Sequence, residues 1–166
     1  MNLTLGMFKE YLHRLPKKME EAAMVGLERA AARAIPILVR SADSAVPASD
    51  NGKRGARDTG HYRKLFKWVR TSRRVVTLYN LAGYAGVIER GRRKGRKMPP
   101  LAAIARWAER RLGLDADEAK RAAYPIAIAI SKRGLRPRKV IESQRERLKK
   151  IARQEVSKSI RGAMKP

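Results

Sequence analysis

Charge is the feature that most constrains this chain. Forty Lys and Arg residues stand against fifteen Asp and Glu residues, which gives a formal charge of +25 over 166 residues. Such an excess repels itself in a compact monomer and draws the protein towards any nearby polyanion. Nucleic acids and acidic protein surfaces both meet that need, and charge alone does not choose between them. Aromatic residues make up only 5% of the chain, which argues against a platform for stacking single-stranded bases.

Length and composition indicate a single domain over residues 1–166, because 43% apolar residues are enough for one modest core. The absence of cysteine excludes disulfides and thiolate metal sites. No apolar run reaches the roughly 18 residues of a transmembrane helix, and residues 1–11 lack the apolar centre of a signal peptide. We therefore expect a protein without a membrane partner, made and used in a cytoplasm.

Apolar residues at three- and four-residue spacings predict a long helix over 16–44, with Pro16 in its first turn and a kink at Pro36. Turn-forming residues over 45–60 predict an exposed, mobile loop. Partial alternation then predicts an antiparallel hairpin of strands 65–71 and 74–80.

A third strand is expected over Tyr84–Glu89, because an isolated hairpin is only marginally stable. Two short helices follow, over 100–112 and from Asp115 or Asp117 to Arg133, with a break at Pro125 in the second. The predicted fold class is α+β.

A long, highly charged helix is predicted over 137–164 as a C-terminal arm. Its apolar stripe continues through Val156 and Ile160 at four-residue steps, so the stripe winds around the axis. The end of this helix either leaves its own core to touch a neighbouring subunit or forms a frayed basic tail. Trp68 and Trp107 are interpreted as core anchors, since one lies in a strand and the other on a periodic helix.

No motif predicts catalysis, a cofactor or a metal. His13 and His61 are the only histidines, and neither has a second ligand at metal-binding spacing. The carboxylates that cluster in sequence begin a helix, where capping explains them; they are Asp115, Asp117 and Glu118. We therefore expect a protein that is not an enzyme.

The densest run of charge is a basic loop over 90–98. It holds six cations with glycines that keep the segment flexible: Arg90, Arg92, Arg93, Lys94, Arg96 and Lys97. The loop either contacts phosphates or an acidic neighbour in an assembly, or it is a solvated segment that aids solubility. We favour contact with a partner because the whole chain carries an excess of positive charge.

The order of several short motifs carries a resemblance to a known family. Asp58-Thr59-Gly60 precedes the hairpin, Tyr84-Ala85 leads to Glu89 and Gly91, and Gly134 with Arg136-Pro137 introduces the last helix. In this order they resemble the tail-completion or neck proteins of long-tailed bacteriophages, also called minor tail, virion morphogenesis or head-tail joining proteins. The resemblance covers residues 16–164.

The resemblance implies a structural virion protein at the head-tail interface, assembled in the host cytoplasm. It implies a homo-oligomeric ring, expected to be sixfold, that completes the tail and joins it to the head connector or stopper. Tail terminator or tail tube proteins would lie on its other side, with genomic DNA passing through the axis. The motif residues Asp58, Thr59, Gly60, Tyr84, Glu89 and Gly91 are expected in loops at the sheet edge, where neighbours in a ring can dock.

The alternative is a basic cytoplasmic nucleic-acid-binding protein that needs no ring. Its basic loop and its basic C-terminal helix would then serve phosphates directly. A nuclease is a further, more distant alternative, disfavoured by the lack of an acidic or histidine metal cluster in the sequence.

Overall fold

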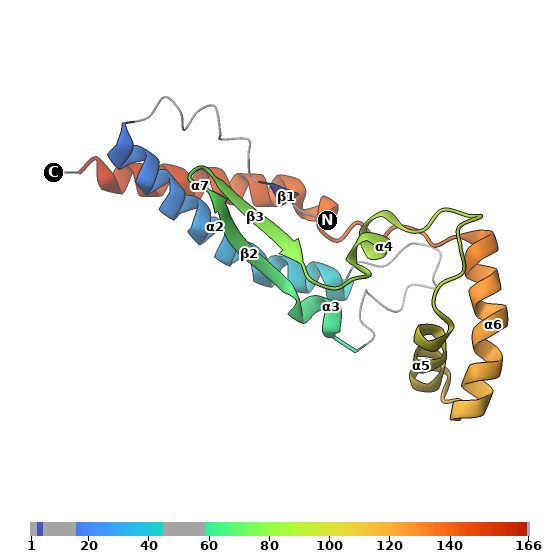
Figure 1. Cartoon of the computed structure of the whole chain (residues 1–166). Coiled ribbons are helices and arrows are strands. Elements are labelled where there is room, and N and C mark those ends of the chain that lie inside the picture. Colours follow the sequence, from blue (N-terminus) through green and yellow to red (C-terminus); the bar gives the residue numbers. More distant parts are fainter. Residues whose placement is uncertain (1–2, 5–15, 45–58, 166) are drawn as a thin grey trace. The chain divides into compact units, whose positions relative to one another are not determined.

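The computed structural model describes residues 3–4, 16–44 and 59–165, and its α+β architecture confirms the predicted class (Figure 1). The chain forms two compact units: unit 1, residues 1–89 and 138–166, and unit 2, residues 90–137. Unit 2 is thus an insertion within the chain of unit 1, whereas the sequence is interpreted above as one domain. The predicted loop over 45–60 lies outside the described residues except for Thr59 and Gly60.

Unit 1 combines two long helices with a small sheet. Its helices are α2 (Lys17–Ser44), α3 (His61–Lys64), α4 (Ala85–Arg90), whose last residue begins unit 2, a 3-10 turn (Glu142–Gln144) and α7 (Arg145–Ala163). Its strands are β1 (Leu3–Thr4), β2 (Phe66–Ser72) and β3 (Val75–Asn80). The helix predicted over 16–44 is confirmed, and α2 continues through Pro36 to Ser44.

Helices α2 and α7 lie side by side and antiparallel, as Figure 1 shows. They approach so closely at Gly26 that an added methyl group would lie 2.7 Å from the Val156 Cα and 2.8 Å from the Glu155 carbonyl oxygen. Towards the other end of α2, the Ser41 hydroxyl donates to the Val140 carbonyl at 3.0 Å. Small residues therefore bring the two backbones together, and α7 buries Leu148, Ala152, Glu155 and Val156 against the core.

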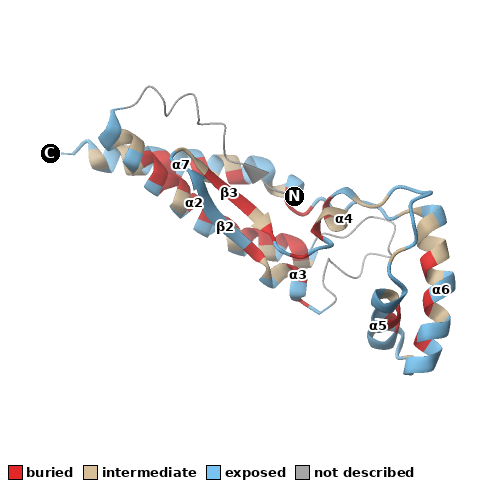
Figure 2. Cartoon of the chain, in the orientation of Figure 1, coloured by how far each residue is buried: buried red, intermediate tan, exposed pale blue. Residues whose placement is uncertain are grey.

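The sheet has the order β1-β3-β2 and packs on α2. The predicted hairpin is confirmed to within one residue at each strand boundary. Val76 and Leu78 of β3 are completely buried, whereas β2 is exposed after Phe66, as Figure 2 shows in red and pale blue. Strand β2 is the sheet edge, and ion pairs join it and the hairpin turn to α2 through Arg70–Glu28 and Arg74–Glu20.

The third strand predicted over Tyr84–Glu89 is wrong. Residues 85–90 form α4, and the sheet's third strand is β1, with Leu3 opposite Leu78. A helical turn places Ala85 and Glu89 on one buried face, four residues apart. The Glu89 carboxylate can then accept hydrogen bonds from inside the core, which explains why the aliphatic run does not extend as a strand.

The predicted start of the last helix at Pro137 is also wrong, since α7 begins at Arg145. Two backbone donors just before it are already used by α4: Arg138 N–H donates to the Ile88 carbonyl at 2.7 Å, and Ile141 N–H donates to Glu89 at 2.9 Å. The end of α7 stays on its own core, because Val156 is buried and Ile160 packs against the same cluster.

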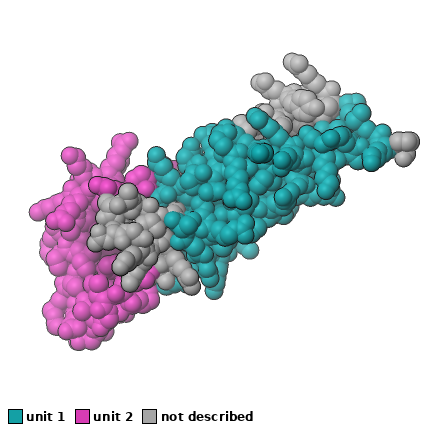
Figure 3. Space-filling view, turned by 180° about the vertical axis from the view of Figure 1, so that it is seen from behind, with its two compact units in different colours: residues 1–89, 138–166 teal, residues 90–137 magenta. Residues whose placement is uncertain are grey.

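Unit 2 is a helical pair formed by α5 (Leu101–Leu112) and α6 (Ala116–Arg133), shown in magenta in Figure 3. Gly113 caps α5 in a left-handed conformation, and Asp115 begins α6 with a reciprocal capping box that includes Glu118. The break predicted at Pro125 is wrong. Pro125 and Arg121 are both exposed, so water can bind the carbonyl that loses its donor.

Neither tryptophan is a core anchor, contrary to the prediction. Trp68 is 36% exposed at the sheet edge, and Trp107 is 37% exposed on α5. The core between α5 and α6 consists of alanines: Ala105, Ala108, Ala119 and Ala123. Helices joined through such small side chains leave no room between them for an indole.

Because α2 and α7 approach closely at Gly26, a side chain at this position should destabilise unit 1. We predict that Gly26→Ala lowers the free energy of unfolding by about 1–3 kcal/mol, because backbone atoms of α7 must move away from the new methyl group. Urea unfolding followed by circular dichroism measures this loss.

Gly162→Ala is the matched control, because Gly162 is also helical and a methyl group there meets nothing within 4 Å. This variant is expected to keep its stability or gain up to about 1 kcal/mol, since alanine favours helix. A similar loss in both variants would contradict the role assigned to the close approach.

Candidate partner-binding surface

The basic loop predicted over 90–98 is not a free arm, because backbone hydrogen bonds hold it against the end of α6. Arg92 and Leu135 exchange two N–H···O bonds of 2.8 Å, and Gly95 N–H donates to the Ser131 carbonyl at 2.8 Å. The Ser131 hydroxyl donates to the Arg96 carbonyl at 2.5 Å, and the Arg92 guanidinium donates to the Lys97 carbonyl. The loop therefore has a defined conformation within unit 2.

Two glycines make this pairing possible. Gly91 and Gly134 both have positive φ, 71° and 75°. A methyl group on Gly91 would lie 2.3 Å from the Leu135 carbonyl oxygen, and one on Gly134 would lie 2.4 Å from that of Arg92. Each glycine thus sits against the backbone of the other segment, where a side chain would force the two apart.

The pairing brings further cations to the loop that sequence reasoning missed. Lys132, Arg133 and Arg136 are exposed and flank the paired residues Gly134 and Leu135. We define the basic cluster by its exposed members: Arg93, Lys94, Arg96, Lys97, Lys132, Arg133 and Arg136. The signal in the sequence is two glycine-containing basic runs, one before and one after the predicted helical pair.

No acidic residue interrupts either side of the basic cluster. The chain has no Asp or Glu from Arg90 to Ala108, and none from Ala119 to Pro137. Unit 2 as a whole holds fourteen Lys and Arg residues against four Asp and Glu residues, a net charge of +10. The two segments that carry the cluster are therefore strongly positive.

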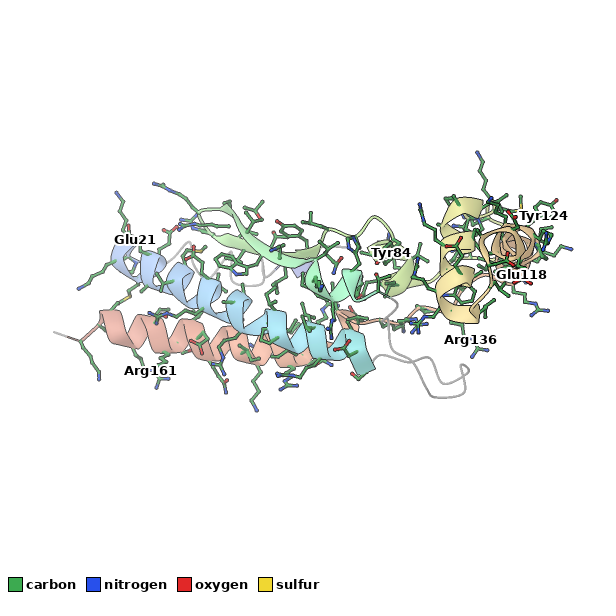
Figure 4. The ribbon with its side chains drawn as sticks, turned by 90° about the horizontal axis from the view of Figure 1, so that it is seen from below. Glu21, Tyr84, Glu118, Tyr124, Arg136 and Arg161 are labelled. Atoms are coloured by element: carbon green, nitrogen blue, oxygen red, sulfur yellow. The ribbon has the colours of Figure 1, made fainter. Side chains whose placement is uncertain are left out.

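Unit 2 also exposes large apolar side chains. Its small alanine core leaves six of them at least 37% exposed: Met98, Leu101, Trp107, Leu112, Tyr124 and Leu135. Figure 4 shows Tyr124 on the side of α6 that faces away from α5. Arginine, methionine and aromatic residues exposed together are typical of protein–protein interfaces.

Glu89 is not at an exposed sheet edge, where the sequence placed it. It is only 3% exposed, and its Oε1 accepts from the Tyr62 hydroxyl at 3.1 Å and from the Ile141 N–H at 2.9 Å. Burial, together with the adjacent Glu89 carboxylate, raises the pKa of the Tyr62 hydroxyl far above its usual range, so this group stays protonated and donates. Glu89 thus ties α3 and the segment before α7 to α4.

Tyr62 was missed by sequence reasoning and is the centre of this arrangement. Its ring is 1% exposed and makes an edge contact with Phe66, with centroids 5.1 Å apart. Its carbonyl accepts from the Asn80 side chain at 2.7 Å. The signal in the sequence is a single aromatic residue within the polar stretch from Asp58 to Lys64.

Thr59, Gly60 and Tyr84, three more of the predicted motif residues, lie near Tyr62. Gly60 precedes α3, where the Thr59 hydroxyl accepts from the His61 N–H at 3.3 Å. Tyr84 is 45% exposed, and its ring centroid lies 6.4 Å from that of Tyr62. Asp58 lies outside the described residues.

The described residues contain no group of three or more His, Asp or Glu side chains placed to hold a metal ion. Within the same residues, no helix combines the length and the apolar character needed to cross a bilayer. Comparisons with protein-family models, with curated proteins and with solved structures give no match.

Loss of the Glu89 carboxylate should destabilise unit 1. We predict that Glu89→Ala lowers the free energy of unfolding by about 2–5 kcal/mol, because the buried Tyr62 hydroxyl and Ile141 N–H both lose their acceptor. Chemical unfolding measures the change. Glu146→Ala, which removes an exposed carboxylate, should cost less than about 0.5 kcal/mol. Equal effects of the two substitutions would mean that Glu89 does not tie the core.

Proposed function

We propose that this chain is a structural subunit of the neck of a long-tailed bacteriophage. In this proposal it forms a ring, expected to be sixfold, that completes the tail and joins it to the head connector or stopper. Tail terminator or tail tube proteins lie on its other side, and genomic DNA passes through the axis. Its place would be in the virion, after assembly in the host cytoplasm.

The convergence of the motif residues carries this proposal. Gly60 lies 24 residues before Tyr84 and 29 before Glu89 in the sequence, yet all three lie beside Tyr62 in unit 1. Gly91 and the segment from Gly134 to Pro137 meet in unit 2. The residues that carry the resemblance are thus the ones that close the fold, which is what a shared fold requires of its motifs.

Unit 2 has the chemistry of a docking element for a protein neighbour. It combines the basic cluster with exposed Trp107, Tyr124 and Leu112. Because every copy of the chain carries the same positive charge, the neighbour that unit 2 fits best has an acidic, partly apolar surface. Another virion protein satisfies that requirement better than a second copy does.

Contacts between copies are better explained by the sheet edge. Strand β2 pairs only with β3 among the described strands, and Val69 on it is 45% exposed. Backbone hydrogen bonds to an edge strand need no opposite charge, so identical basic subunits can associate in this way. Such a contact would also cover the exposed rim of Trp68.

The second candidate is a cytoplasmic nucleic-acid-binding protein, which the charge of the basic cluster favours. It predicts tight, steeply salt-dependent binding of nucleic acid by the basic cluster of the isolated chain, and a uniform distribution of the chain in infected cells. The neck proposal predicts incorporation into particles at one axial position.

Labelled virions test the neck proposal. Electron microscopy of particles that carry a label on this chain should place it between head and tail. Purified particles that lack the polypeptide, with the label spread through the cytoplasm, would overturn the proposal.

The basic cluster should be needed for particle assembly. We predict that changing Arg93, Lys94 and Arg96 to Ser reduces the yield of infectious particles at least about tenfold, since three exposed cations of the docking surface are lost. Plaque titre measures the effect. Changing Lys17, Lys18 and Arg29 to Ser removes three exposed cations of α2 and should leave the titre unchanged. Full infectivity of the cluster variant would remove the basic cluster from the interface.

A further inference from the structure

The exposed face of α7 differs in chemistry from the surface of unit 2. Its exposed cations are Arg145, Arg147, Lys150, Arg153, Lys158 and Arg161, and its one exposed carboxylate is Glu146. That carboxylate is already bonded to Lys149 at 2.6 Å. Figure 4 shows Arg161 extending from the side of α7 away from α2. The outer face of α7 is therefore basic along the whole helix.

Three carboxylates of α2 are already paired with arginines of other elements of unit 1. Glu20 and Glu28 of α2 pair with arginines of the hairpin, and Asp43 pairs with Arg63 of α3 at 3.1 Å. Glu155 is 8% exposed and pairs with Arg33. These four carboxylates are therefore paired with arginines within unit 1.

Five exposed cations of α7 form no ion pair within the described part of the chain: Arg147, Lys150, Arg153, Lys158 and Arg161. Four of them, all except Arg153, share one side of the helix by their spacing. Arg161 donates only to the Ser157 carbonyl of its own helix. These four charges are spread along one face of a 19-residue helix, about 28 Å long. An anion of similar length would complement them.

The same face has no anchor for a protein partner. No large apolar side chain of α7 is exposed. Protein interfaces are centred on apolar or aromatic anchors in pockets, which this face does not offer. It also lacks aromatic residues on which single-stranded bases could stack.

We propose that the outer face of α7 binds the phosphate backbone of duplex nucleic acid, without reading its sequence. A duplex is a rigid line of phosphates with one negative charge per about 1.7 Å of its axis, and the α7 cations form a line of comparable length. Phosphate contacts need charge and hydrogen-bond donors and no apolar anchor, which matches the composition of this face. The proposal concerns the isolated chain and does not depend on ring formation.

Binding of a 30-base-pair DNA duplex to the full chain, measured by fluorescence anisotropy between 50 and 200 mM NaCl, tests the proposal. Changing Arg147, Lys150, Lys158 and Arg161 to Glu should weaken binding at least about tenfold and reduce the slope of log K against log salt by about 3 to 4. The same four positions changed to Gln should produce a smaller loss in the same direction.

The matched control reverses four exposed cations of unit 2, namely Arg93, Lys94, Arg96 and Lys97, and so changes the net charge equally. It should retain most of the affinity and slope. Circular dichroism spectra and melting curves should show that all variants fold, since every altered position is exposed.

Three outcomes would overturn the proposal. They are a wild-type chain that does not bind the duplex, a unit 2 variant that loses as much affinity as the α7 variant, and equally tight binding of polyglutamate. The first denies the activity, the second makes binding a matter of net charge or of the basic cluster, and the third removes the preference for phosphates. None of them bears on whether the chain is found in virions.

Discussion

The contact between α2 and α7 is the constraint on which the rest of unit 1 depends. These helices come from opposite ends of the chain, and residues of the hairpin and α4, which lie between them in the sequence, pack into the same core. The contact is short-range because Gly26 faces the backbone of Val156. The apolar residues of α2 that α7 does not cover are buried by Val76 and Leu78 of the hairpin.

Charge is distributed by the same packing. A chain with forty cations and fifteen carboxylates can neutralise only some of its positive charge internally. Three carboxylates of α2, Glu20, Glu28 and Asp43, form ion pairs with the hairpin and α3 and so join separate elements. Many of the exposed cations lie on two surfaces of different composition: the basic cluster of unit 2 has aromatic and aliphatic side chains nearby, and the outer face of α7 is polar. This difference in composition, and not the amount of charge, separates a surface suited to proteins from one suited to phosphates.

The sequence predicted the elements whose signal is local. The periodic helix over 16–44, the hairpin and the capped helix beginning at Asp115 were all predicted from neighbouring residues. Errors arose where contacts with residues distant in the sequence decide the conformation. Residues 84–89 were predicted as a strand, but Glu89 accepts hydrogen bonds from Tyr62 and Ile141. Residues 137–144 were predicted as helix, but backbone N–H groups of Arg138 and Ile141 donate to α4. Among candidate site residues, the loop cations were found, whereas Lys132, Arg133 and Arg136 join them only through the pairing of Arg92 with Leu135.

The pairing of Arg92 with Leu135 makes unit 2 replaceable as a whole. The first and last segments of unit 2 are adjacent, because Arg92 near its start pairs with Leu135 near its end. A short turn in place of residues 93–134 would join the same two points and leave the hydrogen bonds of unit 1 intact. The helical pair can therefore be exchanged for another of different length or surface without altering the sequence of the unit that carries α7.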